Sequence, residues 1–246
     1  MVSYVVISWQ GLHLLQRLLP QLTATTDSQI IVVDNGSTDG TDIYLQQYKN
    51  QLTVVTLPKN YGVAYARNRG MELARGEWVC ILDNDICFEE KTIQVMIDYM
   101  EKHEDVGLTG CQLLYPDGII QDSCKLYPGI IQKCKNILNR GKIRYSYPYK
   151  MQAVFEPEYV IGACQLIRKK VVDQVGLLDE HIFYGPEDCD YCLRVRQKGW
   201  KVVYLPMVSM IHDCQRKTNA HPSSPLGWKH LKGLFYFYRK HRRFIG

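Results

Sequence analysis

The chain has 246 residues, of which 46% are hydrophobic and 22% charged, a balance typical of a folded globular domain. No apolar run approaches the roughly 20 residues that a membrane-spanning helix needs. The apolar start, Met1 to Ile7, has no basic leader and no small-residue cleavage site, so we expect no secretory signal. The nine scattered cysteines then indicate reduced thiols and a cytoplasmic location.

Before Asp105, short β-rich runs alternate with helical patterns, and the runs are apolar throughout. Strands of this kind are buried on both faces of a parallel sheet that helices cover. We therefore predict an α/β fold with a Rossmann-like, mostly parallel, doubly wound sheet. The predicted strands are Val2–Ser8, Gln29–Asp34, Leu52–Leu57 and Glu77–Leu82, and the predicted helices are Leu12–Leu22, Thr41–Lys49 and Gly62–Ala74.

After Asp105 the pattern changes. Val106–Tyr115 and Ile119–Leu126, joined by Pro116-Asp117-Gly118, are typical of a hairpin. Residues 127–151 are rich in Tyr, Lys, Pro and Gly and are interpreted as a long loop. The later predicted elements are a strand at Tyr159–Ile167, a helix at Pro186–Lys198 and a strand at Lys201–Leu205.

Polar clusters follow three of the predicted strands. Ligands of open α/β sheets bind beyond the carboxyl ends of the strands, so these clusters are candidate binding residues. In the third cluster, two carboxylates two residues apart favour a shared cation, and their oxygens suit Mg²⁺ or Mn²⁺. A solvated turn or a helix N-cap is the alternative interpretation. The clusters are Ser8-Trp9-Gln10, Asp34-Asn35-Gly36-Ser37 and Asp83-Asn84-Asp85.

Two further segments fit a nucleotide ligand. Asn60-Tyr61-Gly62 and Ala66-Arg67-Asn68 bring an amide and a cation to the start of a predicted helix, where a phosphate is stabilised. The Asp34 carboxylate is able to accept hydrogen bonds from a base or ribose. A capping role for Asp34 and a surface position for Arg67 are the alternatives.

Taken together, these motifs resemble the family 2 nucleotide-sugar glycosyltransferases with the GT-A fold. The resemblance implies an added small antiparallel sheet on the acceptor side and an inverting sugar transfer from a nucleotide diphosphate donor. DNGSTDGT combined with N-x-G-x-x-x-A-R-N is most similar to the rhamnosyltransferase branch. The matching segments are VVDNGSTDGT (32–41), NYGVAYARNRG (60–70), DND (83–85), IGACQLIRK (161–169) and YGPEDCDYCLRVRQKGWKVVYLP (184–206).

The resemblance also implies roles for single residues. Asp83 and Asp85 with His212 would hold Mn²⁺ or Mg²⁺, and Asp188 of the Glu187-Asp188 pair would be the catalytic base. Plain helix capping is the alternative interpretation of the Glu187-Asp188 pair. Gln10 departs from the Asn that is common in the family. The candidate donor-binding residues are Ser8, Gln10, Asp34, Asn35, Asn60, Arg67, Asn68, Asp83, Asn84, Gly162 and Ala163.

An inverting transfer is a single displacement, so one carboxylate must take the proton of the acceptor hydroxyl. The expected partners are a UDP- or dTDP-sugar, with rhamnose as a candidate sugar, and a glycan or lipid-linked acceptor. We divide the chain into a domain at 1–221, with a donor half (1–105) and an acceptor half (106–221), and a basic aromatic helix at 222–246.

The net charge of +5 is uneven, because Lys229–Arg243 holds six Lys and Arg residues and no acid. Leu226–Phe244 therefore fits either a peripheral helix on an anionic membrane or a helix packed on the catalytic domain or on a second chain. Nucleic-acid binding is not expected, since no recognition motif accompanies this patch. The sequence leaves the oligomeric state open, with a homo-oligomer as one possibility.

Three other functions compete with the glycosyltransferase hypothesis. Cys189-x-x-Cys192 with His212 and Cys214 has the spacing of zinc ligands, although the two cysteines lie in a helical pattern. A non-catalytic sugar-nucleotide-binding protein would be expected to lack one of the acids at 83, 85 and 188. A sugar nucleotidyltransferase would normally carry a Gly-rich basic loop where this chain has SWQGLHL (8–14).

Overall fold

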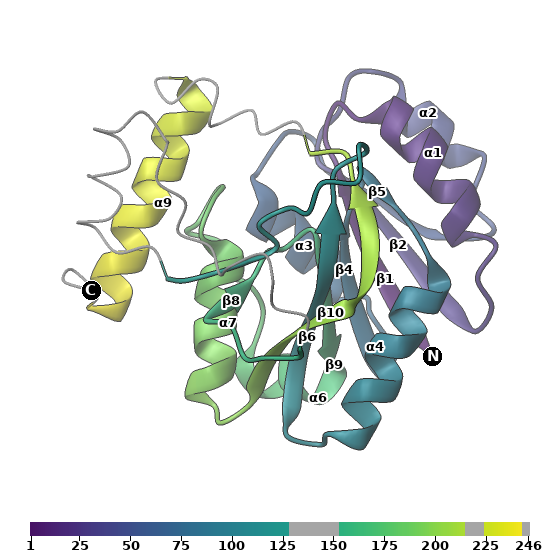
Figure 1. The fold of residues 1–246 in the computed structure, drawn as a ribbon. Helices are drawn as coiled ribbons and strands as arrows, with labels where there is room; N and C mark the ends of the chain where they lie inside the picture. The colour runs from purple at the N-terminus through teal and green to yellow at the C-terminus, as the bar shows by residue number, and fades with distance from the viewer. Residues whose placement is uncertain (128–152, 215–223, 243–246) are drawn as a thin grey trace.

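The computed structural model describes residues 1–127, 153–214 and 224–242, and the predicted loop 127–151 lies, apart from Tyr127, outside them (Figure 1). The helices are α1 (Leu12–Leu22), α2 (Thr41–Gln46), α3 (Val63–Met71), α4 (Glu90–Lys102), α6 (Lys169–Val175), α7 (Glu187–Gln197) and α9 (Pro225–His241). The strands are β1 (Val2–Ser8), β2 (Ser28–Asp34), β3 (Thr53–Thr56), β4 (Trp78–Asp83), β5 (Ile86–Cys87), β6 (Val106–Leu114), β7 (Cys124–Lys125), β8 (Tyr159–Val160), β9 (Cys164–Arg168) and β10 (Lys201–His212).

One eight-stranded sheet organises the chain, in the order β3-β2-β1-β4-β9-β6-β10-β5. β1 pairs in parallel with β2 and β4, and β10 pairs in parallel with β6. β9 is antiparallel to both of its neighbours, and β5 is antiparallel to β10. The prediction of a mostly parallel α/β sheet is confirmed, and β7 with β8 forms the predicted small antiparallel sheet.

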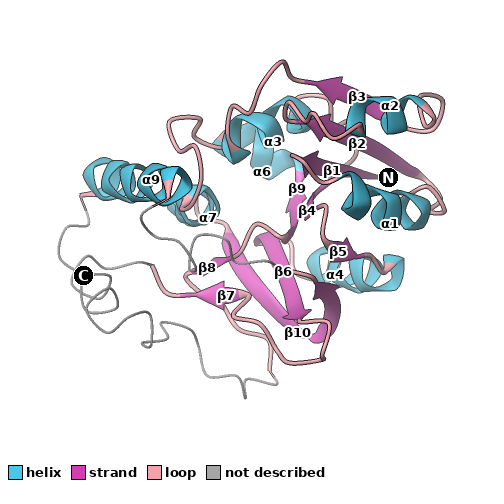
Figure 2. Cartoon of the chain, turned by 90° about the horizontal axis from the view of Figure 1, so that it is seen from above, coloured by secondary structure: helices cyan, strands magenta, loops and turns pink. Residues whose placement is uncertain are grey.

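Helices cover both faces of the large sheet because its strands are apolar on both sides (Figures 1 and 2). Along β1, Tyr4 and Val6 pack into a core with α1, α2 and α4. Val5, between them, points to the opposite face and packs with α3, α6 and α7. The alternation of side chains along a strand thus divides the core into two layers.

The predicted hairpin after Asp105 is wrong in its second arm. The turn forms, with Gly118 N–H donating to the Tyr115 carbonyl, but only the single bridge Leu114–Ile120 returns to β6. β10 occupies one edge of β6 and β9 takes part of the other. Cys124 and Lys125, at the end of the predicted second arm, therefore pair with β8 and not with β6.

Two predicted strand lengths also change. Tyr159–Ile167 is divided into β8 and β9 by a turn at Ile161–Ala163, whose backbone groups bond to other elements. The strand predicted at Lys201–Leu205 continues to His212, with a register shift around Pro206, which has no N–H to donate. Its last residues, Ile211 and His212, pair with β5.

The C-terminal helix α9 packs on α7. Leu234, Phe237 and Tyr238 of α9 form a buried cluster with Cys189 and Leu193 of α7. This contact confirms that one side of the segment packs on the rest of the domain, as one of the two interpretations expected, and it leaves the other side of the helix open. In the described parts of the chain, no helix is both long and apolar enough to cross a membrane.

A buried carboxylate strengthens this contact. Asp190 of α7 is fully buried and accepts hydrogen bonds from Lys240 and His241 of α9 and from Arg194 of its own helix, each at 2.7–2.8 Å. Burial raises the pKa of Asp190, but the charge of Arg194 and the hydrogen bonds from Lys240, His241 and Arg194 outweigh burial and hold the pKa below its ordinary value. The ionised form is therefore the one that the fold stabilises.

We expect Asp190→Asn to lower the free energy of unfolding by about 3 kcal/mol, because it removes the buried carboxylate that pairs with both Arg194 and Lys240. Urea unfolding at neutral pH measures the loss. Since the pKa of folded Asp190 lies below the ordinary 3.8, its contribution is present above pH 3.8 and is lost as the pH falls through the lowered value. The free energies of unfolding of the variant and the wild type should therefore become equal only at acidic pH.

The matched control is Asp173→Asn, which removes the exposed Lys169–Asp173 pair of α6. It should change stability by less than about 0.5 kcal/mol. Equal losses in the two variants would contradict a special role for the buried carboxylate.

Candidate active site

Polar side chains from four strands gather at the carboxyl edge of the sheet, which Figure 2 views from above. Ser8, Asp34, Asp83 and His212 are the last residues of β1, β2, β4 and β10. This is the edge at which open α/β sheets bind ligands.

Asp83, Asp85 and His212 form one candidate metal group, in which one ligand atom from each lies within 4.8 Å of the others. The antiparallel pairing of β5 with β10 brings His212 opposite Ile86, directly beside Asp85. His212 Nε2 lies 3.2 Å from Asp85 Oδ1 and 4.0 Å from an oxygen of Asp83. Of the described residues, only these three make such a group.

Gln121, which the sequence gave no reason to select, fixes the orientation of His212. Its Nε2 lies beside two carbonyl oxygens, those of His212 (2.5 Å) and Leu114 (3.3 Å), and must donate to them. Its Oε1 is then the acceptor for His212 Nδ1–H at 2.8 Å. The tautomer that results turns the lone pair of Nε2 toward the two aspartates.

The site at Nε2 favours positive charge. Burial lowers the pKa of His212, but the carboxylates of Asp85 and Asp83 outweigh burial and raise it. Asp85 Oδ1 is itself buried, and its nearest charged neighbour is His212 Nε2 at 3.2 Å. A cation between these atoms would satisfy all three groups.

Arg67 joins this group to the start of α7. Its side chain is only 4% exposed, and its Nη2 donates to Asp83 Oδ1 at 2.6 Å and to the Gly162 carbonyl at 2.8 Å. Its Nη1 lies 3.3 Å from Glu187 Oε1. Burial lowers the pKa of Arg67, but the charges of Asp83 and Glu187 outweigh it, so the guanidinium stays charged.

Gly162 is required by the close approach of Arg67. A Cβ at position 162 would lie 2.4 Å from Arg67 Nη1, well inside van der Waals contact. The backbone of this turn also serves its neighbours, because the Gly162 amide donates to Asp188 Oδ2 (3.0 Å) and the Ala163 carbonyl accepts from Asp83 N–H (3.0 Å). The turn therefore links the acids of β4 to those of α7.

Glu187 and Asp188 begin α7. Burial, together with the charge of Asp188, raises the pKa of Glu187. Burial likewise raises the pKa of Asp188, although the Cys189 and Gly162 amides that it accepts from and the nearby Lys125 and Arg67 cations oppose the shift. A carboxylate with a raised pKa is a better proton acceptor than a free aspartate.

The candidate nucleotide side lies along β1 and β2. Ser8 Oγ accepts from Asn84 (2.9 Å), and the Gln10 side chain bonds to both the hydroxyl and the amide of Thr38. Asp34 Oδ1 accepts from the Ser37 amide, whereas its Oδ2 is buried without a partner. The structure thus brings these predicted residues to the same edge as the acids.

Three other predicted residues have their side chains engaged within the protein. Asn35 bonds to Asn60, to the Gly62 carbonyl and to the Tyr61 amide, so Asn35 and Asn60 brace the turn before α3. Asn68 bonds to the backbone of Leu178 and to Glu180, away from Arg67's partners. Donor contacts from their side chains stay predictions.

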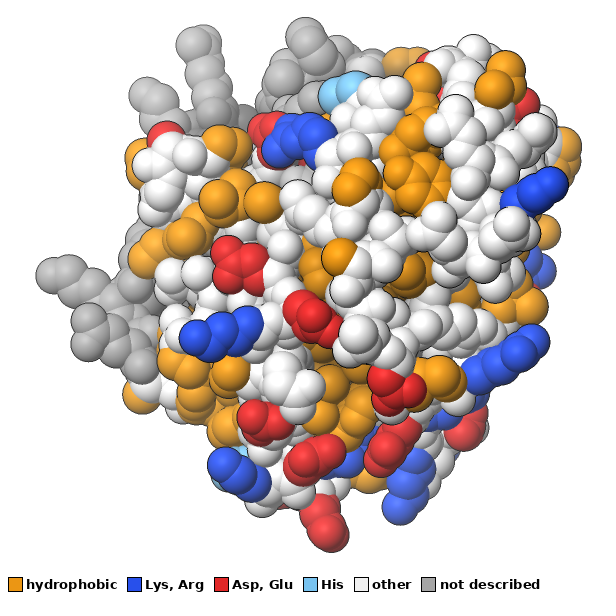
Figure 3. Space-filling model, turned by 90° about the vertical axis from the view of Figure 1, so that its right-hand side faces the viewer, with side chains coloured by type: hydrophobic (Ala, Val, Ile, Leu, Met, Phe, Trp, Pro, Cys, Tyr) orange, Lys and Arg blue, Asp and Glu red, His pale blue; other side chains and the backbone are white. Residues whose placement is uncertain are grey.

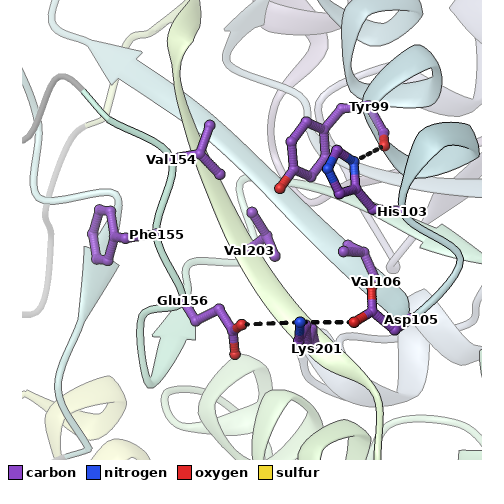
Figure 4. A pocket seen from close by; sticks show the side chains of 9 residues that line it. All are labelled: Tyr99, His103, Asp105, Val106, Val154, Phe155, Glu156, Lys201 and Val203. Atoms are coloured by element: carbon purple, nitrogen blue, oxygen red, sulfur yellow. Dashed lines mark hydrogen bonds and ion pairs between the residues drawn. The ribbon is translucent and has the colours of Figure 1, made fainter.

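A cavity of about 380 Å³ lies at the opposite end of the sheet (Figure 4). Its lining includes Asp105 and Lys201, at the start of β6 and β10, with Lys201 held between Asp105 and Glu156. Because it is at the amino ends of the strands, it is separate from the candidate active site.

The zinc alternative finds no support in the described part of the chain. Cys189 packs with α9, and Cys192 contacts the Val160 carbonyl and Gln165 through its sulfur. Neither cysteine belongs to a group with metal-ligand geometry among the described residues.

Comparison with known proteins identifies the class. The profile of Glycosyl transferase family 2 matches residues 3–176, more than half of the chain. The chain therefore belongs to glycosyl transferase family 2, an inverting family, and transfers sugar from a nucleotide-sugar donor.

Two curated relatives are rhamnosyltransferases. The chain is 28% identical over 252 residues to N-acetylglucosaminyl-diphospho-decaprenol L-rhamnosyltransferase of Mycobacterium tuberculosis, covering 94% of this chain and 81% of the relative. It is 26% identical over 186 residues to dTDP-rhamnosyl transferase RfbF of Shigella flexneri, covering 74% of this chain and 59% of that protein.

A solved structure with a similar fold is the mannosyltransferase PcManGT from Pyrobaculum calidifontis, in complex with GDP-Man and Mn²⁺. Its TM-score is 0.66 at 17% identity, and the match covers 98% of this chain and 64% of that one. This similarity confirms the predicted GT-A-like fold.

We expect Gly162→Ala to destabilise the protein by about 1–3 kcal/mol, because the added methyl group displaces the buried guanidinium. The check is a double-mutant cycle in urea unfolding. In an Arg67→Ala background the clash is gone, so adding Gly162→Ala should cost far less. Additive losses would show that the strain at position 162 does not come from Arg67.

Proposed function

We propose that this protein is a divalent-metal-dependent transferase that moves a sugar, with L-rhamnose as the first candidate, from a dTDP- or UDP-sugar to a hydroxyl of a glycan or lipid-linked acceptor. It would act in the cytoplasm, with residues 1–105 binding the donor and 106–221 the acceptor. The proposal is carried by one observation: Asp83, Asp85 and His212 are connected through Arg67 and Gly162 to Glu187 and Asp188.

The first group fits a divalent cation. Asp83 and Asp85 offer carboxylate oxygens, and His212 offers a nitrogen whose tautomer Gln121 sets. Asp85 Oδ1 is buried and faces His212 Nε2 at 3.2 Å, so an ion between the two atoms would have a ligand on each side. Such an oxygen-rich set suits Mn²⁺ or Mg²⁺. When bound, the ion would neutralise charge on the diphosphate leaving group.

The donor's nucleoside is assigned to the ends of β1 and β2. Asp34 Oδ2 is a buried acceptor that lacks a partner, which supports a hydrogen bond from the base or ribose once the pocket closes around the ligand. The names of the two rhamnosyltransferase relatives support rhamnose, and that of RfbF supports a dTDP donor.

Asp188 is assigned as the base. The Gly162 and Cys189 amides hold its two oxygens in a fixed orientation, and its raised pKa suits proton transfer. The acceptor oxygen bonds to the anomeric carbon as the bond from that carbon to the diphosphate breaks, and Asp188 takes the acceptor's proton. Glu187, which pairs with Arg67, would keep the guanidinium in place during the reaction.

The two alternative functions of this fold are less well supported. A non-catalytic sugar-nucleotide-binding protein has no need of a half-buried Asp188 oriented by two amides. A sugar nucleotidyltransferase needs a basic phosphate loop after its first strand, where this chain has Trp9, Gln10 and Gly11.

We expect Asp188→Asn to lower donor turnover by about a hundredfold or more while the affinity for the donor is kept, since only the proton acceptor is removed. The measurement is hydrolysis of a panel of nucleotide sugars with Mn²⁺, alongside donor binding by calorimetry. Asp173→Asn, on the exposed face of α6, is the control and should behave as wild type. Unchanged turnover in Asp188→Asn would remove the base assignment.

We expect Gln121→Leu to weaken Mn²⁺ binding by about 10–100-fold, because His212 loses the acceptor that orients it. Free Mn²⁺ measured by electron paramagnetic resonance gives the affinity without any turnover. The control is Gln165→Leu, which removes another buried amide. Gln165 bonds to the Val160 carbonyl and to Cys192, and to none of the three candidate ligands. If both variants lost affinity equally, Gln121 would have no particular role at the metal.

A further inference from the structure

The two long faces of α9 differ in what they contact. The inner face packs Leu234, Phe237 and Tyr238 on α7, and Lys240 pairs with the buried Asp190 and with Asp179. This face is therefore already partnered, and α9 is held in place on the catalytic domain.

The outer face is apolar and exposed. Trp228 and Phe235 are 61% and 64% exposed, and Leu231 is 41% exposed. Trp228 and Phe235, seven residues apart, point to the same side of the helix, and Leu231 lies at the edge of that side, toward the buried Tyr238. Isolated exposed apolar residues are ordinary on protein surfaces, but three in a row along one helix form a continuous strip.

Basic side chains border this strip. Lys232 and Arg239 share the side of Trp228 and Phe235, at spacings of four and seven residues, and both are exposed. α9 contains no acidic residue along its whole length. A different face of the molecule, formed around α1, α2 and α4, instead carries acidic and basic side chains close to one another (Figure 3).

We infer that the outer face of α9, made by Trp228, Leu231, Lys232, Phe235 and Arg239, docks on an anionic membrane surface. Apolar side chains enter the interfacial region of a bilayer, Trp prefers that depth, and Lys and Arg pair with acidic headgroups. A protein partner would not require every charge on the helix to have one sign, whereas a bilayer of anionic lipids does favour it. This inference depends on α9 alone and not on the proposed catalytic roles.

The test is co-sedimentation of the full chain with vesicles of phosphatidylcholine alone or mixed with phosphatidylglycerol. The wild type should bind the anionic vesicles, and salt should weaken binding. Trp228→Gln/Leu231→Gln/Phe235→Gln should lower the partition coefficient by about tenfold or more. Lys232→Glu/Arg239→Glu should lower it by about tenfold or more as well, through charge alone.

Two control variants remove similar groups elsewhere. Ile43→Gln removes a side chain of α2 that is 66% exposed, and Lys91→Glu/Lys102→Glu reverses two exposed charges of α4. Both should bind vesicles as the wild type does. The α9 variants should keep their folded circular dichroism spectra and their donor hydrolysis, which separates a failure here from a failure of the proposed chemistry.

Three results would overturn the inference. In the first, the wild type binds neither kind of vesicle. In the second, the α9 variants bind the anionic vesicles as tightly as the wild type does. In the third, light scattering shows a wild-type dimer that the triple variant dissociates, which would assign the face to a second copy of the chain.

Discussion

The buried guanidinium of Arg67 is the contact on which the arrangement of the candidate site depends. It lies between Asp83 of the β4 end and Glu187 of the α7 start, and it also bonds to the Gly162 carbonyl. Burying one charge is costly unless it is paired and fully bonded, and burying two acids without a cation costs more. Arg67 therefore allows carboxylates from distant parts of the sequence to share a small volume.

The three acids at the start of α7 have three different roles, although they lie within four residues of one another. Glu187 pairs with Arg67, Asp188 is held by the Gly162 and Cys189 amides, and Asp190 pairs with cations of α7 and α9. These environments shift their pKa values differently: those of Glu187 and Asp188 are raised, and that of Asp190 is lowered. Neighbouring acids at one helix start are thus separated into a candidate base and a structural anchor.

Asp190 also connects the proposed membrane face to the catalytic helix. Two of its partners, Lys240 and His241, belong to the inner side of α9, and the exposed strip lies on the outer side of the same helix. A helix clamped in this way would hold the catalytic domain at a fixed distance from a bilayer. Acceptors attached to lipid would then be presented to the enzyme at a surface and not from solution.

By itself the sequence determined the α/β class, most of the strands and the acidic turn, because apolar runs and polar strand ends are local signals. It also contained the motifs of family 2, which directed attention to Asp83, Asp85, Asp188 and His212. The insertion of antiparallel β9, the short β7–β8 pair and the extension of β10 to His212 depend on which strand edges are open, and this is settled only when the sheet assembles. Gln121 shows the limit most clearly. The oxygen and nitrogen of its side-chain amide acquire a role only because the fold brings His212 beside them and beside Asp85, and no local pattern encodes a partner 91 residues away.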